Sequence, residues 1–239
     1  MPRLGSLGVE PIIPGALYVV STPIGNLADI TYRAVHLLQG VDLIAAEDTR
    51  TTAILLRHYH ISTKMTSYHS YNQQRQTPVL LNALKNGKAL ALVSDAGTPG
   101  ISDPAYLLVR AAVENDIQII PVPGPSAFLA TLVVSGLPVN RFVFEGFLPL
   151  KKGRNTKIKQ LASETRPLVF YESPHRVLRT VKEFLAAWGD RPCVMGREVT
   201  KKFEEFFRGS LSELIQRLER QKPKGEIVLI IAGCDKKTA

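Results

Sequence analysis

The chain has few cysteines and no long apolar runs. Cys193 and Cys234 are its only cysteines, too few for a disulfide framework or a cysteine-rich metal site. No uninterrupted apolar run approaches the ~20 residues that a membrane-spanning helix requires. The start, MPRLGSLGVEPIIPG, contains three prolines and lacks the continuous apolar segment of a secretory signal. We therefore expect a cytoplasmic globular protein with a flexible leader at residues 1–14.

The sequence also lacks the common motifs for phosphates and metals. It has no G-x-x-x-x-G-K-[ST] motif and no G-x-G-x-x-G motif after a strand. The sequence therefore argues against a P-loop nucleotide site and against an ordinary dinucleotide site. It has no HExxH or CxxC, and its five histidines form no ligand motif. We expect no bound metal.

Acidic residues are scarce in one half of the chain. The net charge is +9, from 30 Lys and Arg against 21 Asp and Glu. Residues 1–122 hold nine basic and nine acidic side chains, so residues 123–239 hold 21 basic and 12 acidic ones and carry the whole excess. This asymmetry indicates an anionic partner approached by the second half, although a solubilising lysine-rich surface explains the charge equally well.

Short apolar runs alternate with helical patterns along the whole chain. In the first half, strands are predicted at residues 16–20, 42–46, 89–93 and 117–122, with helices at 30–39, 50–58, 73–86 and 103–115. The second half repeats the alternation, with strands at 141–147, 168–173, 193–198, 203–209 and 226–233 and helices from 126, at 174–187 and at 210–221. This pattern predicts an α/β fold with a mostly parallel first sheet and some antiparallel pairs in the second half.

A proline-rich segment separates the two halves. PVPGPSA, residues 121–127, has three prolines in five residues, and proline stiffens a connection and removes a hydrogen-bond donor. We predict two tandem α/β domains, at residues 15–122 and 123–235.

Distinctive loops follow the predicted strands. In an open α/β sheet, ligands bind outside the carboxyl ends of the strands, so these loops are where chemistry is expected. They read STPIGNLADIT (21–31), AEDTRTT (46–52), SDAGTPGISDP (94–104), PGPSA (123–127), YESPHR (171–176) and GREVTKKFEE (196–205).

The loop at residues 94–104 has the residues of a ligand-binding turn. Gly97 and Gly100 permit positive φ and let a ligand approach bare backbone. Asp95 stands at the predicted strand tip, where it can accept from a hydroxyl or amine, and Asp103 is placed to cap the next helix. This loop suits a neutral or positively charged ligand and lacks the features of a phosphate cradle.

Together these motifs resemble the tetrapyrrole methylase superfamily. The resemblance covers residues 15–233 and is closest to the members that methylate small-subunit ribosomal RNA. It implies two α/β domains of the class III methyltransferase type, with S-adenosylmethionine (SAM) in the cleft between them, and a homodimer. The implied reaction is methylation of the ribose 2′-oxygen of a cytidine in the decoding centre of 16S ribosomal RNA.

The resemblance also implies which residues bind SAM. Asp95, Gly97, Ile101 and Ser102 would line its methionine end, and Ser126 and Ala127 would contact it by hydroxyl and backbone. From the second half, the implied contacts are Tyr171, Glu172, Lys224 and Gly225, with main-chain groups reading the adenine. Simpler roles are open for Tyr171 as a packing residue, Ser126 as a helix cap and Lys224 as a solvated lysine.

A ribose hydroxyl needs a general base to become nucleophilic. The candidates from strand-end loops of the first half are Glu47, Asp48 and His69, and Arg50 would hold a phosphate. Asp48 also suits the N-cap of the helix DTRTTAILL. The sequence does not choose among these candidates.

One basic segment is the candidate RNA contact. KKGRNTKIK, residues 151–159, has five basic residues and no acidic one, which suits phosphate binding. The five are Lys151, Lys152, Arg154, Lys157 and Lys159.

Two other functions compete with RNA methylation. A methylase of a small porphyrin or corrin explains the SAM loops equally well but leaves the basic second half unexplained. A noncatalytic RNA-binding module explains the charge but leaves the SAM-like loops without a purpose.

Overall fold

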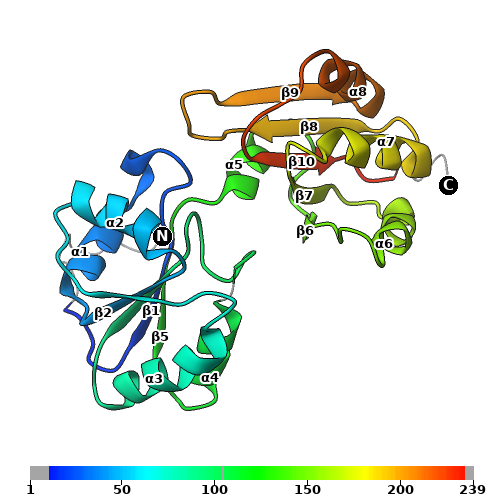
Figure 1. Cartoon of the computed structure of the whole chain (residues 1–239). Coiled ribbons are helices and arrows are strands. Elements are labelled where there is room, and N and C mark those ends of the chain that lie inside the picture. Colours follow the sequence, from blue (N-terminus) through cyan, green and yellow to red (C-terminus); the bar gives the residue numbers. More distant parts are fainter. Residues whose placement is uncertain (1–10, 104, 235–239) are drawn as a thin grey trace, which may run out of the picture. The chain divides into compact units, whose positions relative to one another are not determined.

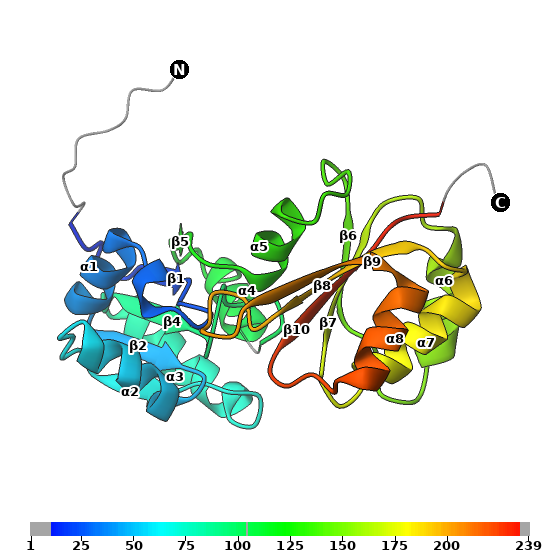
Figure 2. The same cartoon turned by 90° about the horizontal axis from the view of Figure 1, so that it is seen from above.

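The structure is a computed structural model that describes residues 11–103 and 105–234. It divides into two compact units, residues 1–125 and residues 126–239, and the boundary between them falls within the proline-rich segment (Figures 1 and 2). Most of the expected leader, residues 1–10, lies outside the described residues. Each unit contains one five-stranded sheet.

The first unit alternates strands and helices in chain order. Its elements are β1 (Leu17–Val20), the 3₁₀ helix η1 (Leu27–Asp29), α1 (Tyr32–Gly40), β2 (Leu43–Ala46), α2 (Thr49–His58), β3 (Met65–Ser67), α3 (Gln73–Lys85), β4 (Leu90–Val93), α4 (Tyr106–Val113) and β5 (Ile119–Val122). The strands are ordered β3-β2-β4-β1-β5, and all neighbouring pairs are parallel. The parallel first sheet is confirmed.

Both faces of this sheet are covered by helices, which explains the continuous apolar strands. Successive residues of β1 point to opposite faces, so Leu17 packs in one buried cluster with Leu84 and Leu90, and Tyr18 packs in the other with Leu38. All four leucines and Tyr18 are at most 2% exposed.

Two details of the first unit differ from the expectation. β3 was not predicted, because its three residues MTS are half-buried and follow the polar stretch HISTK. The predicted helix at 103–115 begins later, at Tyr106. Asp103 is therefore not its N-cap; its carboxylate accepts from the N–H groups of Gly100, at 2.8 Å, and Ala105, at 3.1 Å, and so shapes the loop.

The second unit has a mixed sheet. Its elements are α5 (Ala127–Val133), β6 (Val143–Phe147), α6 (Arg154–Gln160), the 3₁₀ helix η2 (Leu161–Ser163), β7 (Leu168–Glu172), α7 (Val177–Trp188), β8 (Pro192–Arg197), β9 (Glu205–Ser210), α8 (Leu211–Arg220) and β10 (Ile227–Ile231). The strands are ordered β6-β7-β10-β8-β9; β6 and β7 are parallel and the other pairs are antiparallel, as expected for this half.

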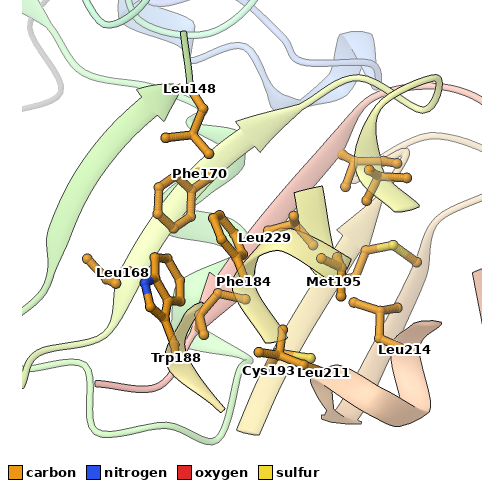
Figure 3. Packing of buried hydrophobic residues seen from close by; sticks show 14 of the residues in the cluster. Leu148, Leu168, Phe170, Phe184, Trp188, Cys193, Met195, Leu211, Leu214 and Leu229 are labelled. Atoms are coloured by element: carbon orange, nitrogen blue, oxygen red, sulfur yellow. The ribbon is translucent and has the colours of Figure 1, made fainter. Parts of the chain in front are cut away.

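An aromatic cluster fills the core on the α7 and α8 face of this sheet (Figure 3). The ring of Phe184 stacks on that of Trp188 with centroids 4.1 Å apart, and Phe170 of β7 packs on Phe184 at 5.0 Å. The Trp188 indole N–H donates to the Ile158 carbonyl at 2.8 Å, which ties α7 to α6. Ser210 and Glu213 form a capping box that fixes the start of α8.

The opposite face of the second sheet is covered by α5. Phe128 and Leu132 of this helix pack on Val169, Val194 and Ile230 of the strands. None of the helices in the described residues has the length and apolar character needed to span a membrane.

Candidate active site

The loops that follow the five parallel strands of the first unit share one edge of its sheet. Parallel strands all end on the same side, so the segments after β1, β2, β3, β4 and β5 lie next to one another. These segments contain STPIG, EDTR, YHSYN, SDAGTPGISD and PGP. The topology therefore brings together motifs that are up to about a hundred residues apart in the sequence.

Three of these loops are joined by direct contacts. Thr22 and Gly97 exchange backbone hydrogen bonds of 2.9 and 3.0 Å, which join the loops after β1 and β4. The hydroxyls of Ser21 and Thr98 lie 2.9 Å apart, and Thr98 donates to the Pro125 carbonyl at 3.4 Å. Together these bonds bring the loop after β5 to the other two. Ser21, Thr22 and Thr98 were not among the predicted site residues; only their place in strand-end loops marked them.

Two glycines are required by this arrangement. Gly97 has φ +80°, a conformation that side chains with a Cβ rarely adopt, as the sequence predicted. A Cβ on Gly124 would lie 2.8 Å from the Cβ of Ser21, so a larger residue would push the loops after β1 and β5 apart. The two glycines therefore allow the backbone conformation and the close approach of these loops.

Glu47 and Asp95 form a carboxylate pair at the ends of β2 and β4. The Asp95 N–H donates to Glu47 Oε2 at 3.2 Å, and Asp95 Oδ1 accepts from the Asp48 N–H at 2.9 Å. Partial burial raises the pKa of Glu47, and the nearby charges of Asp95 and Asp103 add to this. Burial also raises the pKa of Asp95. The pair thus brings a proton acceptor with a raised pKa next to a second carboxylate.

Asp48 is occupied by a different task. It is the N-cap of α2, its Oδ1 accepts from the Arg50 N–H at 2.8 Å, and its Oδ2 pairs with the Arg50 guanidinium at 2.7 Å. Hydrogen bonds from the Arg50 side chain lower the pKa of Asp48 to about 2. A carboxylate that binds protons so weakly is a poor general base near neutral pH. The guanidinium of Arg50 is 90% exposed and remains accessible to a phosphate.

His69 lies beside Glu47, after β3. The electrostatic interaction between the two side chains lowers the pKa of Glu47, against the effect of burial. Its Nδ1 atom is buried and has no hydrogen-bond partner within the residues that the structure describes. The His69 ring also meets that of Tyr71 edge-on, with centroids 6.0 Å apart. The structure thus gathers Glu47, Asp48, Arg50 and His69 at one edge, as the sequence led us to expect of strand-end residues.

The loop after β4 also presents an apolar side chain to solvent. Ile101 is 40% exposed and the neighbouring Ser102 is exposed too. Ile101 thus adds an exposed apolar side chain to the loop that also contains Asp95 and Gly97. This combination suits a ligand with both an apolar part and a positive charge.

In the second unit, Ser126 and Tyr171 are neighbours. Hydrogen bonds with the Phe128 backbone and the Ser126 side chain tend to lower the pKa of Tyr171, but burial outweighs them and raises it. The ring of Tyr171 packs against Phe144 and Phe147 at 5.3 and 5.6 Å. Ser126 occupies the N-cap position of α5 without a side-chain capping bond. Ala127 packs partly buried against the cluster beneath it.

Glu172, Lys224 and Gly225 make contacts of their own within the second unit. Glu172 is 3% exposed; its carboxylate accepts from the Thr180 hydroxyl at 2.6 Å and pairs with Arg176 at 2.7 Å. Its side chain is therefore used inside the protein, which leaves only its backbone for a ligand. The exposed Lys224 accepts at its carbonyl from Arg197, at 3.2 Å, and a Cβ on Gly225 would collide with the Glu198 side chain.

The basic segment does not present all five of its cations. Arg154 is 3% exposed; its guanidinium donates to Glu183 and to the Thr180 hydroxyl, both at 2.7 Å, so its predicted role as an RNA contact is wrong. Lys157 is half-buried and pairs with Glu145 at 2.7 Å. The cations that the segment exposes are Lys151, Lys152 and Lys159.

No group of three or more His, Cys, Asp or Glu side chains in the described part of the chain is arranged to hold a metal ion.

Comparison with known proteins shows which family the chain belongs to. A family model, described as tetrapyrrole (corrin/porphyrin) methylases, matches residues 16–215. The chain belongs to the tetrapyrrole methylase family. Its relatives include ribosomal RNA small subunit methyltransferase I of Synechocystis sp., 51% identical over 92% of this chain and 79% of that protein. The proteins of the same name from Thermotoga maritima and Escherichia coli O157:H7 are each 48% identical over 92% of this chain, and over 99% and 78% of their own lengths.

Solved structures share the fold of this family member at low sequence identity. A cobalt precorrin-4 methyltransferase superposes with a TM-score of 0.67 at 16% identity, over 91% of this chain and 95% of that one. Uroporphyrin-III C-methyl transferase from Thermus thermophilus, complexed with S-adenyl homocysteine, gives 0.65 at 18% identity, over 91% and 97%. The expected two-sheet α/β fold of the tetrapyrrole methylase type is confirmed.

Proposed function

We propose that this chain transfers a methyl group from SAM to the 2′-oxygen of a cytidine ribose in the decoding centre of 16S ribosomal RNA, in the cytoplasm. The observation that carries the proposal is the identity of 48–51%, over 92% of the chain, with ribosomal RNA small subunit methyltransferases I. The basic excess of the second half, +9, supports a polyanionic substrate over a small tetrapyrrole.

The residues at the edge of the first sheet fit SAM. Asp95 offers a carboxylate to the amino group and to the positive sulfonium, and Ile101 offers an apolar wall. Gly97 and Gly124 keep the loop backbone free of side chains, so a ligand can lie against it. From the second unit, Ser126, Ala127, Tyr171, Lys224 and the backbone of Glu172 and Gly225 complete the proposed set. When bound, SAM supplies a methyl group already activated on a sulfonium.

Glu47 is the proposed general base. Burial and neighbouring carboxylates raise its pKa, which brings its proton affinity closer to that needed near neutral pH. Among the described residues, only its Oε2 is hydrogen-bonded, to the Asp95 N–H, which leaves Oε1 for the ribose hydroxyl. Asp48, with a pKa of about 2, holds Arg50 in place to bind a phosphate of the RNA. The electrostatic interaction with His69 acts in the opposite direction and lowers the pKa of Glu47.

The position of the reacting groups does most of the catalytic work. A sulfonium methyl needs no further activation, so the protein has to align the ribose oxygen with the methyl carbon and remove one proton. The contacts among the loops after β1, β4 and β5 supply a fixed backbone for the methyl donor. The Glu47–Asp95 contact supports the choice of Glu47 as the proton acceptor, because it holds this carboxylate at the same edge.

We also propose that the chain forms a homodimer through α5. Leu129, Val133 and Val134 at this helix are 45%, 71% and 43% exposed, although the other side of the helix is packed on the sheet. Exposed apolar side chains on one helix are typical of an interface between copies. Light scattering at micromolar concentration tests this, and a mass near 26.3 kDa would contradict it.

Methyl transfer to defined RNA tests the function. Unmodified 16S RNA, both free and assembled into small subunits, is incubated with the protein and SAM carrying a deuterated methyl group. Mass spectrometry of nuclease fragments then locates the label. A labelled ribose at one cytidine supports the proposal. A label found only on an added porphyrinogen would favour a small-molecule methylase, and RNA binding without transfer would favour a noncatalytic module.

A further inference from the structure

The turn between β8 and β9, residues 198–204, is strained. Glu198 and Thr200 both adopt the left-handed conformation, with φ of 51° and 68°. Thr200 is β-branched, and such residues almost never occupy this region. A non-glycine residue held there costs about 1–3 kcal/mol, so surrounding contacts must impose the conformation. Strain of this kind is often found where a protein presents groups to a ligand.

The contacts that impose it come from both sides of the turn. The Glu198 carboxylate accepts from the Glu226 N–H at 3.0 Å and pairs with Lys201 at 2.9 Å, and the Glu226 N–H is the main reason that the pKa of Glu198 is lowered. The Glu204 carboxylate accepts from the Thr200 N–H at 2.7 Å. Val199 is 7% exposed, so its buried side chain attaches the turn to the rest of the unit. The turn is thus built as a rigid support.

The support holds an aromatic ring and a cation in solvent. Phe203 is 64% exposed, and the Lys202 ammonium lies 5.6 Å from the centre of its ring. Within residues 11–103 and 105–234, Lys202 forms no ion pair. The turn thus presents an aromatic ring and an ammonium group side by side, the two kinds of group that bind the bases and phosphates of a single-stranded nucleic acid.

Further exposed cations lie on the same edge of the second sheet. The strand directions place the carboxyl ends of β6, β7 and β8 and the amino ends of β9 and β10 on this edge, which includes the β8–β9 turn (Figure 1). Arg197, at the end of β8, donates to the Lys224 carbonyl at 3.2 Å and so joins the turn to the segment before β10. The exposed lysines of this edge are Lys151, Lys152, Lys202, Lys222 and Lys224.

We infer that the β8–β9 turn binds the RNA substrate, with Phe203 stacked on an unpaired base and Lys202 on a neighbouring phosphate. The inference rests on the proposed function, because that function supplies the RNA. Stacking of a base on an aromatic side chain contributes about 1–3 kcal/mol and is independent of sequence, and a rigid ring loses little entropy on binding. A second copy of the chain is disfavoured as the occupant, because Lys202, Lys222 and Lys224 would face like charges there.

Variants of Phe203 separate stacking from mere apolar contact. Phe203→Ala should weaken binding of the RNA about 5- to 150-fold, the equivalent of ~1–3 kcal/mol. Phe203→Leu keeps apolar bulk without a ring and should lose most of the affinity, whereas Phe203→Trp should retain it. Because the side chain is exposed, the thermal unfolding of these variants should match that of the wild type.

A lysine pair supplies the electrostatic control. Lys202→Gln should reduce the slope of log affinity against log salt by roughly 0.7–0.9. Lys88 is an exposed lysine just before β4, on the amino side of the first sheet. Lys88→Gln should leave the salt slope unchanged. SAM affinity, measured by calorimetry, should be the same in all of these proteins.

Each outcome is decisive. RNA affinity of Phe203→Ala equal to that of the wild type overturns the inference, as does a change in dimer mass without a change in RNA affinity. The wild-type assay separates the two proposals. If the wild type methylates the RNA but Phe203→Ala binds it normally, only this inference fails, whereas a wild type that transfers no methyl group to RNA contradicts the proposed function.

Discussion

Replacement of the buried Arg154 by glutamine is expected to destabilise the second unit strongly. The Arg154 side chain is 4% exposed, and it lies 2.7 Å from Glu183 and 4.0 Å from Glu172, whose side chain is 1% exposed. Arg154→Gln removes the one positive charge that both carboxylates share, and leaves Glu172 with Arg176 and Glu183 with Arg179. Breaking a buried ion pair on one side costs about 3–5 kcal/mol, because the remaining charge stays desolvated.

The assay is unfolding in urea followed by tryptophan fluorescence. Trp188 is the only tryptophan of the chain, and its indole donates to Ile158 of α6, the helix that Arg154 begins. The signal therefore reports on the second unit. A loss of 3 kcal/mol should also lower the melting temperature of a unit of this size by about 10–20 °C.

Matched variants show whether the charge is responsible. Lys159→Gln, on the exposed side of α6, should change the free energy of unfolding by less than about 0.5 kcal/mol. Adding Glu183→Gln to Arg154→Gln should recover part of the loss, because it removes a carboxylate that would keep Arg179 alone as its partner. A cost below about 1 kcal/mol for Arg154→Gln, or no recovery in the double variant, would refute the reasoning.

Three further predictions concern the chemistry and the substrate. Glu47→Gln should lower kcat by about 10²–10⁴-fold in the methylation assay. Burial raises the pKa of Glu47 in the folded chain, so ionisation of Glu47 destabilises the fold as the pH rises through that pKa. At neutral pH the Glu47→Gln variant should therefore melt at a higher temperature than the wild type. An equal or lower melting temperature would contradict this. Gly97→Val should abolish SAM binding in calorimetry without unfolding the chain, because valine resists φ +80°; unchanged affinity would contradict it. Lys151, Lys152 and Lys159 replaced together by glutamine should lower the salt slope of RNA binding by roughly 2–3 and leave SAM affinity unchanged, whereas an unchanged slope would favour a small substrate.

The sequence was sufficient for most of the fold because the strands of the first sheet are covered on both faces. Such strands are continuous apolar runs, such as LYVV of β1 and LALV of β4, and they are easily told from the amphipathic helices between them. β3 was missed because MTS is short and carries no apolar run, and its pairing with β2 supplies what its own residues lack.

The candidate site was predictable in place but not in detail. The places of Glu47 and Asp95 followed from the predicted strands before them, whereas His69 follows β3, the strand that the sequence did not reveal. The sequence did not reveal which carboxylate is free for catalysis. That depends on Arg50, which lowers the pKa of Asp48, and on burial, which raises the pKa of Glu47.

Arg154 shows why a charge pattern cannot locate a surface. It lies among four lysines in KKGRNTKIK, and from the sequence it cannot be told from an exposed cation. Its partners Glu183 and Glu172 are 29 and 18 positions away and meet it only in the folded unit. The same holds for the β8–β9 turn, where EVTKKFEE marks a turn but the φ of Thr200 is visible only in the structure.

The division of charge between the two halves follows from the chemistry proposed for them. A carboxylate base repels the phosphates that flank a ribose, by ~0.4–1.7 kcal/mol for each pair at about 10 Å, depending on the effective dielectric constant. Glu47 and Asp95 both impose this repulsion, and burial raises the pKa of each of them. Adding lysines beside Glu47 would ease the repulsion, but it would also lower the pKa of Glu47 and weaken it as a base. Cations can attract the RNA without this penalty only if they lie away from the base. A first half with no net charge and a second half that carries the whole +9 satisfy both requirements.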